Sequence, residues 1–185
     1  MTPAYIGMLR GVNVGAHRRI KMEDLRMMGS RLGFQNVQTY VQSGNIVFQT
    51  ATSERPTPLS KRITGAILHD FGFQVPVIIR TSEEMGRVIT GNPFLKEKDI
   101  ELSKLHVTFL SERPRAGSLK KLETISMGPD RFYPGSNEIY LYCPGGYGVT
   151  KLSNAAIEKT LSVEATTRNW KTTNTLFEMA SKLLS

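Results

Sequence analysis

One stretch decides the fold: Val37-Gln38-Thr39-Tyr40-Val41-Gln42-Ser43-Gly44-Asn45-Ile46-Val47-Phe48-Gln49. Val37–Gln42 and Ile46–Gln49 are rich in β-branched and aromatic residues and read as two strands. Ser43-Gly44-Asn45 between them has the composition of a tight turn. The sequence therefore predicts a β-hairpin here.

The elements around this hairpin complete a recognisable unit. Apolar periodicity and turn residues predict, in order, a strand at Tyr5–Arg10, a basic loop at Gly11–Arg19, a helix from Met22 that stops at Gly33, the hairpin, a polar loop at Ser53–Pro58, a helix with Leu59, Ile63, Ile67 and Phe71 on its apolar face, and a strand at Val75–Arg80. Pro76 favours an edge position for the last strand. The order is β-α-β-β-α-β, the split βαβ or ferredoxin-like unit.

The second half repeats this order. The same criteria predict a linking helix at Ser82–Ile89 with Ser82 as N-cap, a strand at Leu105–Leu110, a short helix at Ser118–Ile125 and a hairpin of Arg131–Tyr133 and Glu138–Cys143 around Gly135-Ser136-Asn137. They then predict a helix at about Lys151–Leu161, a last short strand into which Val163–Thr167 leads, and a helix at Thr172–Leu184. The sequence thus predicts an α+β chain of two tandem ferredoxin-like units with antiparallel sheets. Residues 1–81 form the first unit, and 82–185 hold the linking helix, the second unit and the C-terminal helix.

Composition and charge narrow the classes of function. The 185 residues include 24 Lys and Arg against 16 Asp and Glu, a net charge of +8, which favours anionic partners. The single cysteine, Cys143, excludes an internal disulfide and reads as a core residue of its strand. Without a signal peptide or a long apolar run, we expect a cytoplasmic protein with no membrane association.

Several motifs resemble the domain-of-unknown-function family 1697. The resemblance rests on Leu9-Arg10-Gly11-Val12-Asn13-Val14-Gly15, Ile20-Lys21-Met22, Thr39-Tyr40-Val41-Gln42-Ser43-Gly44-Asn45, Gly146-Tyr147-Gly148, Lys151-Leu152 and Ala165-Thr166-Thr167-Arg168-Asn169-Trp170. It extends over nearly the whole chain and departs at Ala16, where the family has a second glycine. The family is largely bacterial and has no established activity. The resemblance therefore implies unit boundaries, a cytoplasmic location and a choice of motifs, and it implies no reaction.

A strand order of 4-1-3-2 in each half would gather these motifs into two clusters. The first joins Arg10–Arg19 to the turn at 42–45, and the second joins Gly145–Gly148 and Lys151 to Arg168–Trp170. Both motif sets are rich in cations, amides and glycine and lack carboxylates, which is the chemistry of an anion site. The residues expected to bind a small phosphorylated or carboxylated ligand are Arg10, Asn13, Arg19, Lys21, Gln42, Ser43, Asn45, Tyr147, Lys151, Arg168, Asn169 and Trp170.

Other readings stay open. Ser43-Gly44-Asn45 is sufficient as turn chemistry, and Trp170 is sufficient as a packing residue. Tyr140 and Tyr142 could face an open side of a sheet and stack bases, so an RNA- or DNA-binding module is one alternative. An enzyme acting electrostatically through cations, and an interaction module without a ligand, are the others. The sequence assigns no catalytic residue, and it does not decide between monomer and homodimer.

Metal and cofactor sites are not expected. The three histidines, His17, His69 and His106, fall on a loop, a helix and a strand without the spacing of metal ligands. Gly145–Lys151 is not a Walker motif, because it lacks the Gly-Lys-Ser/Thr ending.

Overall fold

The computed structural model describes residues 2–115, 117–125 and 128–185. They form a mixed α+β fold with two four-stranded antiparallel sheets and six α-helices. The chain divides into two compact units: unit 1 comprises Met1–Gly86 and Thr175–Ser185, and unit 2 comprises Arg87–Asn174. Within the described ranges, no helix combines the length and the apolar character needed to cross a membrane.

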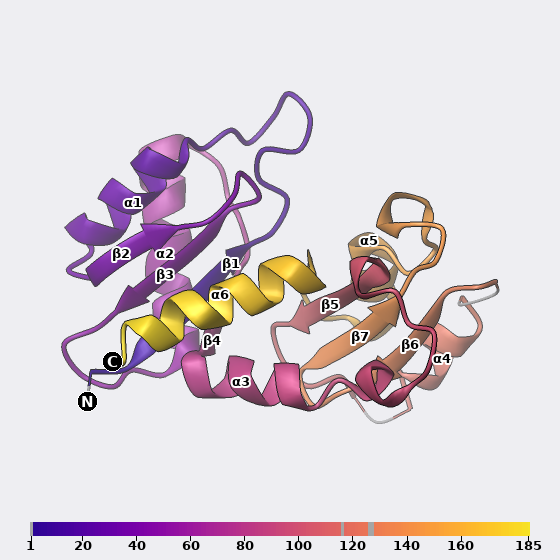
Figure 1. The fold of residues 1–185 in the computed structure, drawn as a ribbon. Helices are drawn as coiled ribbons and strands as arrows, with labels where there is room; N and C mark the ends of the chain where they lie inside the picture. Colours follow the sequence, from indigo (N-terminus) through magenta and orange to yellow (C-terminus); the bar gives the residue numbers. More distant parts are fainter. Residues whose placement is uncertain (1, 116, 126–127) are drawn as a thin grey trace. The chain divides into compact units, whose positions relative to one another are not determined.

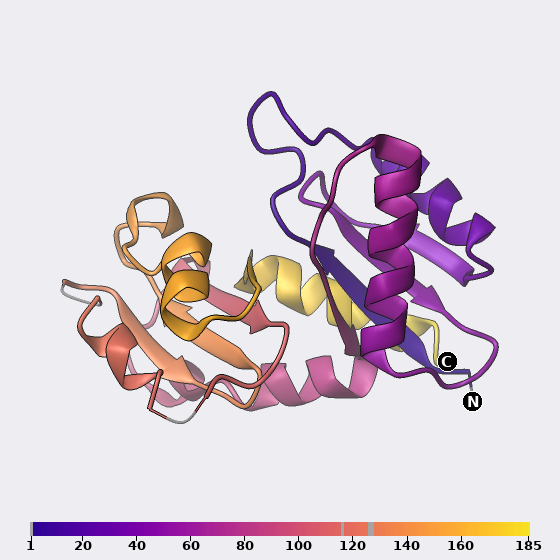
Figure 2. The same ribbon diagram turned by 180° about the vertical axis from the view of Figure 1, so that it is seen from behind.

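Unit 1 is built on a sheet with the strand order β2-β3-β1-β4. Its elements are β1 (Ala4–Leu9), α1 (Met22–Arg31), β2 (Gln35–Thr39), β3 (Asn45–Gln49), α2 (Pro56–Phe71), β4 (Val77–Thr81) and the beginning of α3 (Ser82–Thr90). Helices α1 and α2 cover one face of the sheet, and the C-terminal part of α6 (Trp170–Lys182) crosses the other face (Figure 1, Figure 2). Residues of both faces are buried: Tyr5 and Phe48 belong to the core that α1 and α2 cover, while Ile6 and Val47 occupy the opposite face.

Unit 2 repeats this strand order as β6-β7-β5-β8. Its elements are the end of α3, η1 (Pro93–Lys96), η2 (Leu102–Lys104), β5 (Leu105–Leu110), α4 (Lys120–Glu123), β6 (Arg131–Pro134), β7 (Glu138–Tyr142), η3 (Tyr147–Val149), α5 (Asn154–Leu161), β8 (Ala165–Asn169) and the beginning of α6. Helices α4 and α5 lie on one face of this sheet (Figure 2). Leu141, Cys143 and Ile157 are in the core beneath them.

The predicted order of elements is found in both halves, and several boundaries differ for identifiable reasons. Strand β5 coincides with the prediction, and β4 lies at a sheet edge as expected, although Pro76 precedes it. The expected polar loop ends early because α2 begins at Pro56, and proline is tolerated in a first helical turn. Strand β2 ends at Thr39 because the Asn45 side chain donates a 2.9 Å hydrogen bond to the carbonyl of Tyr40 and closes a longer turn.

The helix caps also correct the sequence prediction. The cap of α3 is Thr81 rather than Ser82: its hydroxyl accepts from the Glu84 N–H at 3.1 Å, and the Glu84 carboxylate accepts from the Thr81 N–H at 2.9 Å. This reciprocal pair is a capping box. Ser153 caps α5, which therefore begins at Asn154 and leaves Lys151 outside the helix.

The ends of the two units share a detail beyond strand order. In each, an arginine is the fourth residue of the last strand: Arg80 in β4 and Arg168 in β8. Each donates from Nη1 to the carbonyl of the residue before it, at 2.9 Å. The next residue, Thr81 or Asn169, caps a helix that follows without a loop. The two units thus agree in strand order and also in the positions of this arginine and of the helix cap that follows it.

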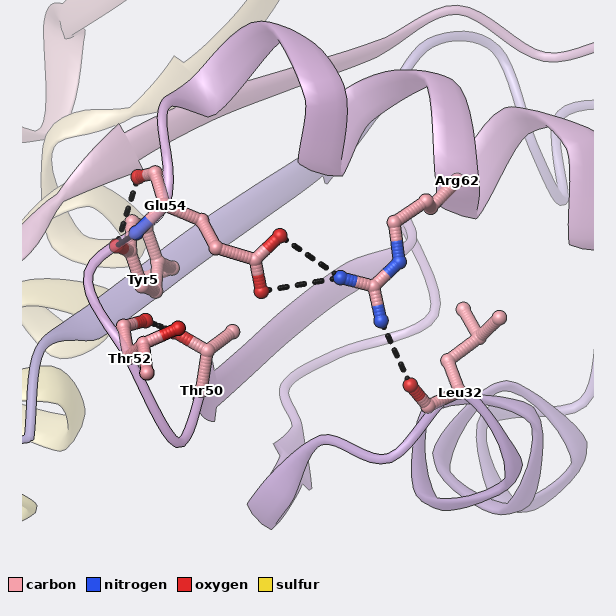
Figure 3. A network of polar contacts seen from close by, with 6 residues as sticks. All are labelled: Tyr5, Leu32, Thr50, Thr52, Glu54 and Arg62. Atoms are coloured by element: carbon pink, nitrogen blue, oxygen red, sulfur yellow. Dashed lines mark hydrogen bonds and ion pairs between the residues drawn. The ribbon is translucent and has the colours of Figure 1, made fainter.

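Polar contacts fix the connection between β3 and α2 (Figure 3). The guanidinium of Arg62 donates to both carboxylate oxygens of Glu54, at 3.0 and 2.9 Å, and to the carbonyl of Leu32 at 2.8 Å. Buried Tyr5 donates its hydroxyl to the Glu54 carbonyl and accepts from the Glu54 N–H, both at 2.8 Å. The connection is thus tied to β1, to α2 and to the end of α1.

Candidate functional site

The basic loop, residues 10–21, connects β1 to α1 and protrudes from unit 1 (Figure 1). The side chain of Asn13 closes its base. Asn13 Oδ1 accepts from the Ile20 N–H at 2.9 Å, and Nδ2 donates to the carbonyls of Ile20 at 2.9 Å and Gln42 at 2.7 Å. The Asn13 N–H donates to the carbonyl of Arg18 at 3.1 Å. These contacts join the two ends of the loop, much as a backbone ladder joins two strands.

The hairpin turn, residues 40–45, lies against this loop, as the strand order predicted. Asn13 contacts the carbonyl of Gln42, and the Leu9 N–H donates to the carbonyl of Gly44 at 2.8 Å. Gly44 has φ +76°, and a Cβ there would overlap Cγ2 of Val12 and stand 2.9 Å from Cβ of Leu9. Only glycine therefore allows the loop and the turn to approach this closely.

The cationic side chains of the basic loop are largely exposed. Arg18, Arg19 and Lys21 are exposed, and Arg10 is half-buried. Arg19 donates to the Gly15 carbonyl at 3.3 Å, within the loop itself. Beyond the loop, acidic Glu23 and Asp24 occupy the first turn of α1, where they complement the helix dipole. The loop thus presents positive charge to solvent.

The polar residues of the first cluster have different roles. The amide groups of Asn13 and Asn45 serve the backbone: buried Asn45 donates to the Tyr40 carbonyl and to the Ser43 hydroxyl, at 2.9 and 3.1 Å. Gln42 and Ser43 are exposed. Between them and β2, Val41 adopts φ +50°, an uncommon conformation for a β-branched residue. The turn therefore contains local backbone strain beside the basic loop.

The second cluster centres on the glycine loop, residues 145–151. Its Tyr147 hydroxyl donates to Thr167 Oγ1 on β8 at 3.0 Å, and its ring stacks on His106 with 5.0 Å between centroids. Thr167 Oγ1 is also 2.7 Å from Thr108 Oγ1 and from Asn154 Oδ1. The structure thus brings the loop against β8 through Tyr147 and Thr167, the residue just before the predicted partners Arg168, Asn169 and Trp170.

The next three residues, Arg168, Asn169 and Trp170, make other hydrogen bonds. Thr167 faces α5, so the alternation of the strand directs its neighbour Arg168 to the opposite face, where Nη1 donates to Thr166 Oγ1 at 2.8 Å. Arg168 is buried, and burial lowers the pKa of its guanidinium to about 10, so it stays cationic at neutral pH. Asn169 Oδ1 caps α6 at 2.7 Å from the Thr172 nitrogen, and Trp170 is buried. Arg168 and Trp170 are therefore buried, whereas Asn169 is exposed.

Lys151 lies at a separate pocket of about 190 Å³ in unit 2. The pocket is lined by Ile125, Gly128, Pro129, Asp130, Gly145, Val149, Lys151 and Leu152. Asp130 places a carboxylate in the second cluster, whereas the sequence motifs suggested a site without carboxylates. Asp130 is not part of the glycine-loop motif in the sequence. It belongs to the segment before β6, and the fold brings its carboxylate next to Thr150 of the glycine loop.

The sheet face that could have stacked bases is covered. Tyr140 is buried and donates its hydroxyl to the Val88 carbonyl at 3.0 Å. Tyr142 packs 5.9 Å from the ring of Phe94, and the guanidinium of Arg131 lies 5.2 Å from the Tyr142 centroid. These rings therefore stabilise the fold and are not available as a stacking platform.

Sequence reasoning missed the polar residues around Tyr147. Thr108 interrupts an apolar strand at a helix-facing position, and that interruption was the one available signal. Burial lowers the pKa of His106, so its ring is neutral at physiological pH. Among the residues that the structure describes, no group of three or more His, Cys, Asp and Glu side chains is arranged to hold a metal ion.

Comparisons with known proteins found a family model and a solved structure that match this chain. Residues 1–140 match the family model described as protein of unknown function, DUF1697, and this range contains the basic loop and the hairpin turn. The conserved bacterial protein SP0830 from Streptococcus pneumoniae has a similar fold, with a TM-score of 0.73 and 21% sequence identity over 97% of this chain and 99% of that one. A search of curated proteins gave no match. With three quarters of its length matched, the chain belongs to the DUF1697 family.

Proposed function

We propose that this protein binds the anionic group of a small phosphorylated or carboxylated molecule between the basic loop and the hairpin turn. One observation carries the proposal: the Asn13 side chain makes three hydrogen bonds that close the loop and attach it to the turn. A loop closed in this way loses little conformational entropy when it binds a ligand.

The available donors suit such a group. Arg18, Arg19 and Lys21 are exposed cations on one short loop, and exposed Gln42 and Ser43 lie on the adjoining turn. Arginine matches the planar geometry of carboxylate and phosphate oxygens, and lysine supplies a point charge. Asn13 and Asn45 support the site by holding the backbone, and in this proposal they do not contact the ligand.

The test removes charge and leaves the backbone intact. Arg18→Ser/Arg19→Ser removes two exposed side chains, and Arg55→Gln/Lys61→Gln removes two exposed cations elsewhere in unit 1. Titration calorimetry with inorganic phosphate, sulfate, nucleoside monophosphates, sugar phosphates and dicarboxylates gives the affinity of each protein. We expect the loop variant to lose about tenfold or more in affinity for the best ligand. Equal affinity in the two variants, or no binding by the native chain, contradicts the proposal.

A nucleic acid is the second candidate ligand. The observation that favours it is the exposure of the cations on a protruding loop, which an extended phosphate backbone can reach. Such binding weakens steeply with salt, with a slope set by the number of phosphates neutralised. Binding to single-stranded RNA that falls about twentyfold to fiftyfold between 50 and 200 mM salt, as three or four neutralised phosphates predict, would support this candidate. Binding to mononucleotides alone supports the small ligand instead.

We further propose that each half is a ferredoxin-like unit and that the halves arose by duplication, with a divide near Ser82. The shared strand order and the equivalent positions of Arg80 and Arg168 support this. Expression of 1–81 and 82–185 as separate chains tests the divide. Two folded products, or a folded complex on mixing, would support it, and two unfolded chains that do not assemble would contradict it.

A further inference from the structure

We propose that the pocket at the glycine loop is a second binding site, for a small zwitterion with an apolar body such as a free apolar amino acid. The pocket lies entirely in unit 2 and does not depend on the function proposed for the basic loop. Its lining is mainly apolar, from Ile125, Pro129, Val149 and Leu152, and the charged residues among those that line it are Asp130 and Lys151. Two opposite charges beside an apolar wall indicate the class of ligand.

The carboxylate of Asp130 is held in place. Asp130 is half-buried, and its Oδ2 accepts from the Thr150 hydroxyl at 2.6 Å. The Leu152 N–H donates to the same hydroxyl at 3.1 Å, which fixes the position of Thr150. A carboxylate has about four acceptor sites, so it can accept from a ligand ammonium group in addition to its partners within the protein.

Lys151 supplies the complementary charge. It is exposed, and its ammonium makes no hydrogen bond or ion pair with any residue in the described part of the chain. A ligand carboxylate can therefore bind it without displacing another partner. Asp130 disfavours a ligand that is only anionic, and Lys151 disfavours one that is only cationic. A molecule carrying both charges satisfies both side chains.

The size and lining of the pocket complete the inference. About 190 Å³ is below the roughly 300–1,000 Å³ of sites for drug-sized molecules and suits a molecule of amino-acid size. Val149, which lines the pocket, is 77% exposed. A ligand that covers it removes apolar surface from water. The neighbouring Cys143 thiol, which contacts Thr150, is kept neutral by burial, which raises its pKa, and adds no competing charge.

The test compares three compounds with one carbon skeleton. L-leucine carries both charges, 4-methylpentanoate lacks the amine, and 3-methylbutan-1-amine lacks the carboxylate. Ligand-observed NMR and calorimetry on the full chain give the affinities. We expect L-leucine to bind about tenfold or more tightly than either analogue. No binding by any of the three, or equal affinity of L-leucine and 4-methylpentanoate, would overturn the proposal.

Variants then assign each charge. Lys151→Gln should bind L-leucine no better than the amine, and Asp130→Asn should bind it no better than the carboxylate. The side-chain amide oxygen in Asp130→Asn can still accept from Thr150, so the fold is retained.

Lys159→Gln and Asp99→Asn change exposed residues of the same unit and should leave the preference unchanged. An unaltered preference in Lys151→Gln and Asp130→Asn would overturn the site. The basic-loop variant Arg18→Ser/Arg19→Ser should bind L-leucine normally, which separates this result from the function proposed above.

Discussion

The side-chain amide of Gln49 donates a 3.0 Å hydrogen bond to the backbone carbonyl of Leu183, 134 residues further along the chain. The same nitrogen donates to the carbonyl of Thr2 at 3.2 Å, and Gln49 Oε1 accepts from Asn36 at 2.6 Å. One buried side chain on β3 thus joins the first residues, the β2 edge and the C-terminal segment of unit 1. The C-terminal segment therefore belongs to unit 1, together with the N-terminal strand β1.

Replacing Gln49 by leucine should destabilise unit 1. Leucine has a similar volume but leaves two carbonyls and the Asn36 amide without this partner, at a cost of about 1–3 kcal/mol. Urea unfolding followed by circular dichroism measures the change. Gln38→Leu, at an exposed position of β2, is the matched control and should stay within about 0.5 kcal/mol of the native protein. Equal stability of the two variants would show that the Gln49 contacts contribute no net stability.

Local residue patterns in the sequence were sufficient to predict much of the fold, but only part of the candidate site. Leu105–Leu110 could be placed to the residue because its composition and its flanks agree. The hairpin turn at Gly44 and the basic loop lie together as predicted, because the strand order places both at the same end of the sheet. What Gln49 or Asp130 contacts could not be inferred, since each partner comes from a distant segment and carries no periodic signal. Strand alternation could have separated Arg168 from Tyr147, but burial of Arg168 depends on tertiary packing.

Gly44→Ala should separate the turn from the basic loop. The new Cβ would overlap Val12 Cγ2 and lie 2.9 Å from Leu9 Cβ, at a φ of +76°. Overpacking and strain together predict a loss of about 2–4 kcal/mol in the free energy of unfolding. Gly65→Ala in α2 is the control, because no atom lies within 4 Å of its Cβ position. That change should stabilise the helix by about 0.5–1 kcal/mol, so the two substitutions should shift the urea midpoint in opposite directions.

Alkaline pH should weaken the fold through Cys143. Burial raises the pKa of this thiol to about 11, whereas an exposed thiol titrates near about 8.5. Between these values the unfolded chain has lost a proton that the folded chain keeps, so stability falls as the pH rises, by at most about 1.4 kcal/mol per pH unit. Urea midpoints between about pH 8 and pH 10 measure this slope.

Cys143→Ala provides the control for that measurement. It removes the titrating group, so its stability should depend less steeply on pH over the same range, although the lost side chain lowers stability throughout. The native thiol should also react with a disulfide reagent only after unfolding, because it is fully buried. Parallel pH profiles for the two proteins, or fast labelling of the folded chain, would be incompatible with this account of Cys143.

Asn13→Leu should release the basic loop while leaving the sheets folded. Leucine is close to asparagine in length but cannot accept from the Ile20 N–H or donate to the carbonyls of Ile20 and Gln42. Hydrogen exchange at the Ile20 amide should become at least about tenfold faster, since a lost hydrogen bond of about 1.4 kcal/mol corresponds to that factor. Amides of β1 and β3 should keep their protection. Asp99→Leu, at an exposed residue of unit 2 that also has a positive φ, controls for the backbone effect of placing leucine in this conformation. If Ile20 exchanges at the native rate in Asn13→Leu, the loop is held by contacts other than this side chain, and the observation that carries the anion-binding proposal loses its force.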